Sequence, residues 1–231
     1  MSLRLTLAGA AACLAVSAPF AVAASTADDN VNILRGTERA DQIAGLGGND
    51  IIYGFRGFDL LRGDAGADLI LGGRGGDTVL GGTEDDAIFG NQGRDALLGQ
   101  AGNDVIFGGD QADVIGGGSG DDRLLGGRGN DTIFASAGAD VELGGRGNDV
   151  LIARANDGQV DTLICGPGND IAFARAEDVV DPTCETVNRV AAAEAEPADE
   201  DQAPAAEVAP SGDNDLQGDE DGSSDLPAQR K

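Results

Sequence analysis

Aspartate recurs every nine residues along most of this chain, and this period constrains the fold more than any other feature of the sequence. Thirteen aspartates share one uninterrupted register: Asp41, Asp50, Asp59, Asp68, Asp77, Asp86, Asp95, Asp104, Asp113, Asp122, Asp131, Asp140 and Asp149. A three-residue insertion around Asn156-Asp157-Gly158 follows, and the period resumes at Asp161 and Asp170. Chance does not hold one phase over so many nonamers, so we interpret the segment as an array of short structural repeats.

Glycine surrounds each aspartate, and 38 of the 231 residues are glycine, more than twice the roughly 7% of ordinary domains. In the clearest copies, residues 72–80 read GGRGGDTVL and residues 126–134 read GGRGNDTIF. The six residues up to the aspartate predict a turn, because glycine reaches backbone angles that are closed to other residues. The three residues after it predict a very short strand whose middle residue faces the interior.

These nonamers resemble the RTX, or hemolysin-type calcium-binding, repeat GGxGxDxUx over residues about 36 to 173. The resemblance implies an all-β fold, a right-handed parallel β-roll (a β-solenoid) whose glycine-rich turns bind Ca²⁺. The implied metal-binding residues are all fifteen in-phase aspartates, including Asp161 and Asp170, and the glycines of the cleanest turns: Gly73, Gly75, Gly127, Gly129, Gly145 and Gly147.

One nonamer makes half a coil, so a full coil takes 18 residues, and residues 18 apart stack about 4.8 Å from one another. The interior position is filled almost wholly by β-formers and Leu: Ile43, Ile52, Leu61, Ile70, Val79, Ile88, Leu97, Ile106, Ile115, Leu124, Ile133 and Leu151. The same stacking places Asp50 over Asp68 and Asp59 over Asp77. Stacked carboxylates repel one another by roughly 1 kcal/mol in water and by more at a lower dielectric.

A Ca²⁺ ion between successive turns reverses this repulsion, because it binds carboxylates from two turns together with backbone carbonyl oxygens. The chain has no His, which leaves the oxygen ligands that suit calcium. Residues 25–190 hold 29 acids and 12 Arg, and the thirteen in-phase aspartates form 11 stacked pairs, so up to about 11 Ca²⁺ ions would neutralise the roll. The aliphatic core is thin, so we expect folding to require calcium. The alternative is a calcium-free solenoid in which aspartate only favours turns, although Asn or Ser would serve equally well there.

Four copies lack glycine at the fourth position of the nonamer and have Arg39, Glu84, Gln111 and Gln159 instead. A residue with a side chain does not readily adopt the usual turn, so calcium binding by these loops stays open, although Glu84 offers an extra carboxylate. The copy ending at Asp140 has Ala135 in place of the first glycine and Glu142 at the interior position. Because burying an unpaired Glu is unfavourable, we expect this coil to be distorted or Glu142 to turn outward.

The N-terminal residues predict a secretory signal peptide over 1–24. A short basic start precedes an apolar run from Leu5 to about Val16, and Ala21-Val22-Ala23 fits a cleavage site near Ala23-Ala24. The apolar run is short for a membrane anchor, and the residues before Cys13 match a lipidation site poorly. We therefore expect a secreted, extracellular protein with no membrane span, in which residues 25–35 lead into the roll.

After the roll, residues 160–190 resemble the terminal segment of secreted family members, which predicts a cap over 174–190 with a disulfide between Cys165 and Cys184. Two free thiols are the alternative. Residues 191–231 contain 12 acids and two basic residues and predict a disordered acidic tail. An uncleaved export signal in this tail is a second interpretation, although the N-terminal signal makes it redundant.

Repeat, cap and tail take up almost the whole mature chain, and the absence of His removes the commonest general base. The predicted function is therefore that of a secreted, non-enzymatic calcium-binding protein. The alternative is a calcium-dependent adhesin or a matrix- or surface-assembly protein, which would self-associate or bind a cell-surface partner. It rests on an apolar column at the position three after alternate aspartates: Tyr53, Leu71, Phe89, Phe107, Leu125 and Leu143. The negative charge disfavours nucleic acid as a partner.

Overall fold

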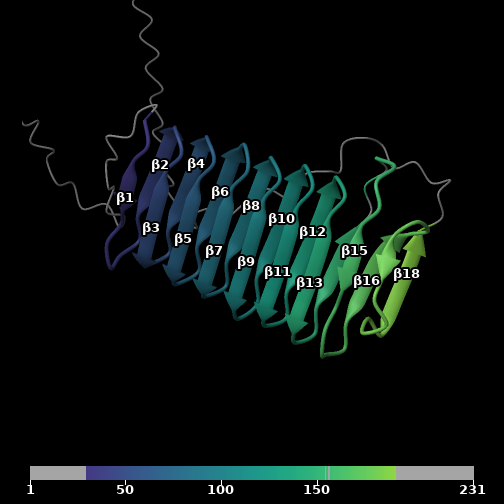
Figure 1. Ribbon diagram of the computed structural model, residues 1–231. Helices are drawn as coiled ribbons and strands as arrows, with labels where there is room; N and C mark the ends of the chain where they lie inside the picture. The colour runs from purple at the N-terminus through teal and green to yellow at the C-terminus, as the bar shows by residue number, and fades with distance from the viewer. Residues whose placement is uncertain (1–29, 154, 156, 191–231) are drawn as a thin grey trace, which may run out of the picture.

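The computed structural model describes residues 30–153, 155 and 157–190, so the expected signal peptide and acidic tail lie outside the described residues. Eighteen strands alternate between two parallel sheets of nine strands each (Figure 1). One sheet contains β1 (Ile33–Arg35), β3 (Ile51–Arg56), β5 (Leu69–Arg74), β7 (Ala87–Gln92), β9 (Val105–Asp110), β11 (Arg123–Arg128), β13 (Val141–Arg146), β15 (Thr162–Ile164) and β17 (Val179–Val180). The other contains β2 (Gln42–Gly47), β4 (Leu60–Ala65), β6 (Thr78–Thr83), β8 (Ala96–Ala101), β10 (Val114–Ser119), β12 (Thr132–Ala137), β14 (Val150–Ala153), β16 (Ile171–Arg175) and β18 (Thr186–Val190).

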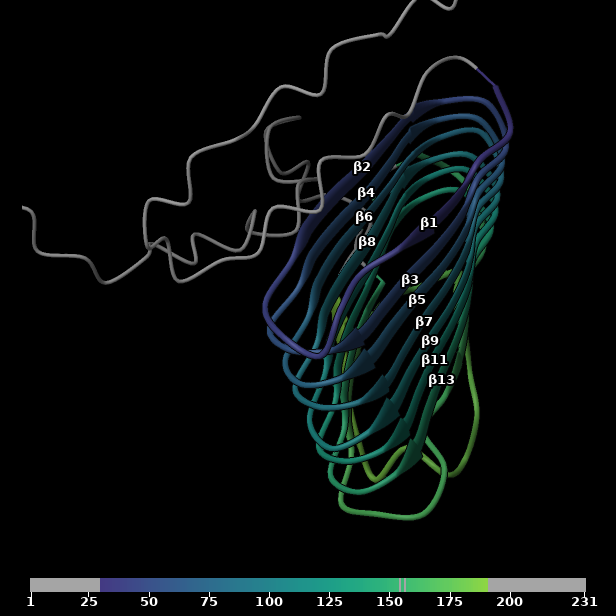
Figure 2. The ribbon, with the colours of Figure 1, turned by 90° about the vertical axis from the view of Figure 1, so that its left-hand side faces the viewer.

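The chain changes sheet after every strand, so it winds into a parallel β-solenoid, and the predicted fold class is confirmed. Figure 2 shows the odd-numbered and even-numbered sheets as two facing layers. Strand β1 comes from the expected lead-in, and β17 and β18 come from the expected cap. Within the described residues there is no helix, and so none long and apolar enough to cross a membrane.

The strand register repeats the aspartate period. Ile52 pairs with Ile70, and Ile88 pairs with Ile106, so each coil takes 18 residues as expected. The insertion lengthens the spacing between one pair of strands in each sheet to 21 residues: Val141 pairs with Thr162, and Val150 pairs with Ile171. Toward the C-terminus the coils shorten, and the last pairs of strands are 17 and 15 residues apart.

The strands are longer than the sequence predicts. Most have six residues instead of three, because the first three residues of the next nonamer continue the strand, as Gly81–Thr83 do in β6. Glycines of neighbouring coils lie in register there, and Gly127 pairs with Gly145. Without side chains the backbones approach closely enough to extend the ladder. The turn proper is therefore only three residues long, such as 84–86.

The core is a single file of aliphatic side chains from each sheet, and the predicted interior residues from Ile43 to Leu151 are all buried. Glu142 lies in the same file, and the expectation that it turns outward or distorts its coil was wrong. It is 0% exposed, and it pairs in regular register with Leu124 and Leu163. Hydrogen-bonded ladders on both sides of β13 fix its backbone, so the side chain at this position must point into the core.

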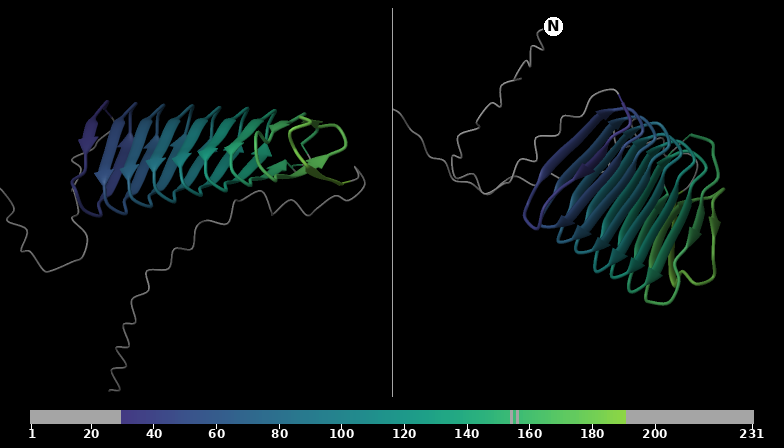
Figure 3. Two further views of the ribbon diagram at one scale, coloured as in Figure 1. Left: turned by 90° about the horizontal axis from the view of Figure 1, so that it is seen from below. Right: turned by 60° about the vertical axis from the view of Figure 1, so that its left-hand side comes forward.

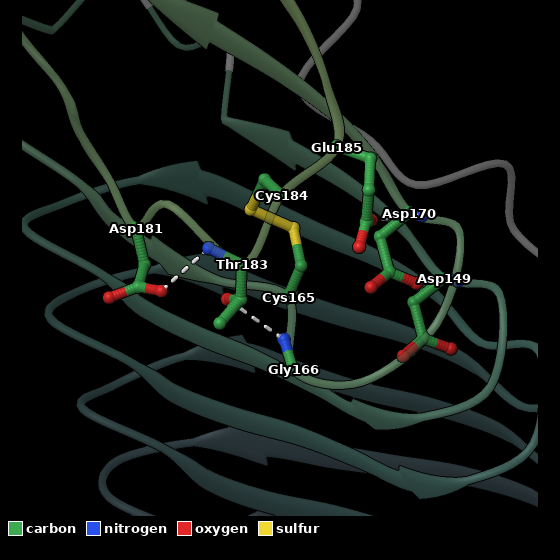
Figure 4. Close-up of a disulfide and its surroundings, with 8 residues drawn as sticks. All are labelled: Asp149, Cys165, Gly166, Asp170, Asp181, Thr183, Cys184 and Glu185. Carbon is green, nitrogen blue, oxygen red and sulfur yellow. Dashed lines mark hydrogen bonds between the residues drawn. A yellow bond between two sulfur atoms is a disulfide. The ribbon is translucent and has the colours of Figure 1, made fainter.

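The C-terminal end of the solenoid is closed by the predicted disulfide between Cys165 and Cys184, which is present and buried (Figure 4). Thr183 fixes the same junction, because its Oγ1 accepts a hydrogen bond of 3.1 Å from the N–H of Gly166. Figure 3 shows the strands as a continuous stack that ends at β18. The disulfide therefore ties the segment before β18 to the coil that contains β15.

Candidate metal centre

The in-phase aspartates form two ladders inside the turns of the roll. All fifteen are buried, with at most 3% of each residue exposed. The backbone N–H of one aspartate donates to the Oδ1 of the aspartate one coil later, as Asp95 does to Asp113 at 2.9 Å. Eleven such bonds join aspartates 18 residues apart, at 2.6–2.9 Å. Two more bridge the insertion, from Asp140 to Asp161 and from Asp149 to Asp170.

The second oxygen of most of these carboxylates has no partner. Thirteen of the in-phase aspartates have a buried Oδ2 without a hydrogen bond: Asp50, Asp59, Asp68, Asp77, Asp86, Asp95, Asp104, Asp113, Asp122, Asp131, Asp140, Asp149 and Asp170. In eleven of these aspartates the Oδ2 lies against the glycine five residues earlier, whereas Asp140 and Asp170 have Ala135 and Cys165 at that position. A Cβ on Gly90 would lie 2.5 Å from the Oδ2 of Asp95 and 2.6 Å from the carbonyl oxygen of Gly108 in the next coil. The unpaired Oδ2 thus faces a carbonyl oxygen across the same space, which is unfavourable unless a cation or a proton lies between them.

Further carbonyl oxygens point from one coil to the next. The six glycines predicted as metal-binding residues all have a left-handed backbone, with φ between 108° and 156°. At the fourth position, a Cβ on Gly75 or Gly147 would overlap the carbonyl oxygen of the residue one coil earlier, so these two residues must be glycine. The turn hydrogen bonds use the third-position carbonyl instead, as Gly75 N–H does with Gln92 O at 2.8 Å. Fourth-position carbonyls are therefore directed into the space between coils.

Two of the four turns that lack glycine at the fourth position still adopt a left-handed backbone there. Glu84 and Gln111 adopt the left-handed conformation, with φ of 79° and 82°, so the expectation that a side chain there disrupts the turn was wrong for them. Asp86 and Asp113, which end these turns, have the same unpaired Oδ2 as their neighbours. Their φ is smaller than that of the glycines one coil away, such as Gly102 at 139° and Gly129 at 156°, so they reach the left-handed region at an angle that a side chain tolerates better.

The turns with Arg39 and Gln159 do differ, because neither residue has a left-handed φ. In the first of them, the Oδ2 of Asp41 accepts a hydrogen bond of 2.5 Å from the N–H of Thr37. Neither Asp41 nor Asp161 is among the aspartates with a buried, unpaired Oδ2. The two turns thus lack the feature that the other thirteen share.

The burial of the ladders changes their acidity. Burial raises the pKa of Asp113 and Asp140 to about 8 and that of Asp86 and Asp122 to about 7. The hydrogen bond from the previous coil lowers each pKa, and the charge of stacked neighbours raises it again. Burial, followed by the charges of Asp161 and Asp140, also raises the pKa of Glu142 well above its ordinary value. The metal-free ladders therefore resist full ionisation at neutral pH.

The donor atoms fit a hard cation. Within the described residues, no three acidic or cysteine side chains gather closely enough to bind a metal by themselves. A site between coils would therefore combine stacked aspartates with carbonyl oxygens of the glycine turns. An all-oxygen set of this kind suits Ca²⁺, which takes six to eight oxygen ligands in flexible geometry, and it lacks the nitrogen and sulfur that zinc prefers.

The nine-residue register misses two residues that extend the ladders. Asp161 N–H donates to the Oδ1 of Asp178 at 3.2 Å, and Asp170 N–H donates to the Oε2 of Glu185 at 2.8 Å. Figure 4 shows Asp149, Asp170 and Glu185 in one stack. What could have identified these two acids is their place beside a strand: each directly precedes one, β17 or β18, as in-phase aspartates do. The Oδ2 of Asp178 accepts from Arg175 N–H at 2.6 Å, so this carboxylate is fully paired.

A second, exposed ladder runs along the fifth position of the nonamer, outside the aspartate register. The side-chain Oδ1 of Asp85 accepts from Asn103 N–H at 2.7 Å, Asn103 accepts from Asp121 N–H, and Asp121 accepts from Ala139 N–H. Asn and Asp alternate here because either side chain supplies the acceptor. The inner ladder instead keeps aspartate in every copy, which indicates that it needs the second carboxylate oxygen.

Comparison with known families agrees with this geometry. Four copies of the RTX calcium-binding nonapeptide repeat match residues 26–54, 56–79, 80–115 and 116–151, which together make up more than half of the chain. No curated protein sequence matches the chain significantly. Repeat period, glycine turns and buried aspartate ladders coincide over the matched residues, and the chain belongs to the RTX calcium-binding nonapeptide repeat family.

Proposed function

We propose that this chain is a secreted, non-enzymatic calcium-binding protein that folds when Ca²⁺ fills the spaces between its stacked turns. The observation that carries the proposal is the set of thirteen aspartates with a buried, unpaired Oδ2. On one edge they stack as Asp50, Asp68, Asp86, Asp104, Asp122 and Asp140, and on the other as Asp59, Asp77, Asp95, Asp113, Asp131, Asp149 and Asp170. Eleven stacked pairs thus have an unpaired oxygen on both members, which supports binding of up to about 11 ions.

Calcium supplies positive charge to the space between the turns, where the unpaired Oδ2 atoms face carbonyl oxygens. The chain's own residues provide the ligands, because each Oδ1 fixes the stacking and leaves the Oδ2 available. The core adds one aliphatic side chain per half coil in most of the roll, a small burial for so long a chain. Binding and folding are therefore coupled, since the unfolded chain does not hold these oxygens together.

Two features support secretion. The pattern of residues 1–24 is that of a cleaved signal peptide, and the Cys165–Cys184 disulfide fits an oxidising compartment. A non-enzymatic role is supported by the absence of His from the sequence and by the ladders, which use all fifteen in-phase aspartates for stacking.

Neighbouring residues in one turn offer a matched test. Asp122→Asn and Asp121→Asn each remove one charge and keep an Oδ1 acceptor, but only Asp122 has the buried, unpaired Oδ2. We expect Asp122→Asn to bind fewer Ca²⁺ ions in isothermal titration and to need more calcium for half-maximal β signal in circular dichroism. Asp121→Asn should behave like the unmodified chain. Equal effects of the two substitutions, or a β signal that EGTA does not change, would overturn the proposal.

A further inference from the structure

A long groove lies on the outer face of the odd-numbered sheet, with a volume of about 1130 Å³. Three rows of residues line it along the axis of the roll. One row is apolar and includes Tyr53, Leu71, Leu143 and Ile164. The next is mostly glycine, with Gly73, Gly109, Gly127 and Gly145 beside Phe55 and Asn91. The third contains Arg56, Arg74, Arg128 and Arg146, with Gln92 and Asp110 between the two pairs. The apolar row continues through Phe89 and Phe107, whose rings stack with centroids 5.0 Å apart.

The arginines stand in two pairs on neighbouring strands. Arg56 lies in register with Arg74, and Arg128 lies in register with Arg146. Like charges at about 4.8 Å on adjacent strands are unfavourable. Arg56 and Arg128 make exposed ion pairs, with Glu38 at 2.9 Å and with Asp110 at 3.7 Å. No carboxylate of the described residues pairs with Arg74 or Arg146, so each pair keeps one guanidinium available to an anion.

This arrangement belongs to one face only. The arginines occupy the third position of the nonamer. On the even-numbered sheet this position holds small residues: Gly47, Ala65, Thr83, Ala101, Ser119 and Ala137. Residues 25–190 have a net charge of -17, so a basic row beside an apolar row is exceptional on this roll. The groove therefore fits an extended segment that carries carboxylates and scattered apolar side chains.

The chain contains such a segment. We propose that the acidic tail of residues 191–231 lies in this groove of its own roll. The two arginine pairs are four coils apart, about 19 Å at the usual strand spacing. In the tail, Asp213 and Asp215 precede Asp219–Asp221 by six residues, about 20 Å in an extended chain, with Leu216 between them. Each acidic cluster thus reaches one arginine pair while Leu216 contacts the apolar row.

The tether permits this placement. Residues 191–212 connect β18 to the first acidic cluster, and a flexible chain of that length has an end-to-end distance of about 25 Å. Intramolecular attachment gives the tail a high effective concentration, so modest contacts suffice. The inference rests on the proposed calcium binding, because a metal-free roll would repel the tail, whose own net charge is -10.

Protease cleavage at Glu220, inside the second acidic cluster, reports on the tail directly. In the full-length chain with calcium, we expect a glutamate-specific protease to cut there about tenfold more slowly than in the Arg74→Gln/Arg146→Gln variant, because charge-assisted contacts hold the cluster. Arg94→Gln/Arg123→Gln is the matched control. It removes two charges from exposed arginines outside the groove lining and should leave cleavage unchanged.

Circular dichroism and light scattering on the same samples separate the possible failures. Absence of a calcium-dependent β signal would refute the proposed calcium binding itself. A folded roll with equal cleavage in all three chains would overturn only the placement of the tail. A calcium-dependent dimer abolished by Phe89→Ser with Phe107→Ser would also overturn it, because the groove would then receive a second copy, as the adhesin alternative requires. A monomer whose protection is lost only in the groove variant supports the inference.

Discussion

The backbone N–H of Asp104 donates a hydrogen bond of 2.7 Å to the Oδ1 of Asp122, one coil later, while the Oδ2 of Asp122 is buried without a partner. One oxygen of the carboxylate therefore sets the stacking of coils, and the other is available to a cation or a proton. Coil stacking and the proposed cation binding therefore depend on the same side chain, so changes in pH, metal and sequence should act on both.

The calcium-free roll should be more stable in acid than at neutral pH. Burial raises the pKa of Asp113 and Asp140 to about 8, above the value of about 3.9 in an unfolded chain. The folded state therefore holds more protons between these values, and its free energy of unfolding falls as the pH rises through this window. Circular dichroism of calcium-depleted protein should show more β structure at pH 5 than at pH 8. The reverse order would contradict the burial of these carboxylates.

Glycine at the fourth position should be indispensable where coils approach closely. Gly93 has a φ of 150°, and a Cβ there would overlap the carbonyl oxygen of Gly75. We expect Gly93→Ala to lower the free energy of unfolding by about 3 kcal/mol in chemical denaturation with calcium. Gly158 is the control, because its φ is 79° but no atom lies within 4 Å of its Cβ position. Gly158→Ala should lose only about 1 kcal/mol, and equal losses would show that backbone angle alone decides.

Removing the buried carboxyl group of Glu142 should stabilise the roll. Both carboxylate oxygens lack hydrogen bonds, and the neighbours in register are Leu124 and Leu163. Glu142→Leu should raise the free energy of unfolding by about 2 kcal/mol, because it removes a desolvated polar group and continues the aliphatic file. Glu142→Gln should gain less, since it keeps two unpaired polar atoms. Destabilisation of the Leu variant, measured by denaturation with calcium, would show that Glu142 has a bound cation as its partner.

Loss of the disulfide should loosen the C-terminal end before the rest. Cys165 and Cys184 are 19 residues apart, and a link of this length contributes about 3 kcal/mol. In a Cys165→Ser/Cys184→Ser variant, hydrogen exchange should quicken in β18 and remain unchanged in β8. Equal acceleration in both strands would indicate that the disulfide stabilises the whole solenoid.

The fold follows from the sequence because one period sets three things together. The nine-residue spacing of aspartate fixes the coil length, the interior file and the stacking, so Ile52 over Ile70 and Asp50 over Asp68 are predictable from numbering alone. Packing then adds only detail. The strands proved longer than expected because glycines also align between coils.

Predictions made from the side chain alone were wrong at positions where contacts with neighbouring coils decide the conformation. Glu84 adopts an angle that its side chain disfavours, and Glu142 stays buried without a partner, because ladders on both sides hold each backbone. Asp178 and Glu185 fall outside the period, so counting did not find them, although both continue the ladders. Such positions depend on contacts 15 to 21 residues away, which local propensity does not describe.

The inner aspartate ladder has a direction, since every backbone N–H donates to a carboxylate that comes later in the chain. A coil emerging from a ribosome or an export channel cannot complete its bonds until the following stretch has arrived. During synthesis, the backbone N–H of the last aspartate made therefore has no acceptor until the next coil has been made. Asp178 and Glu185 are the residues that answer the last in-phase aspartates, Asp161 and Asp170. A chain that stopped before them would leave the backbone N–H groups of Asp161 and Asp170 without acceptors.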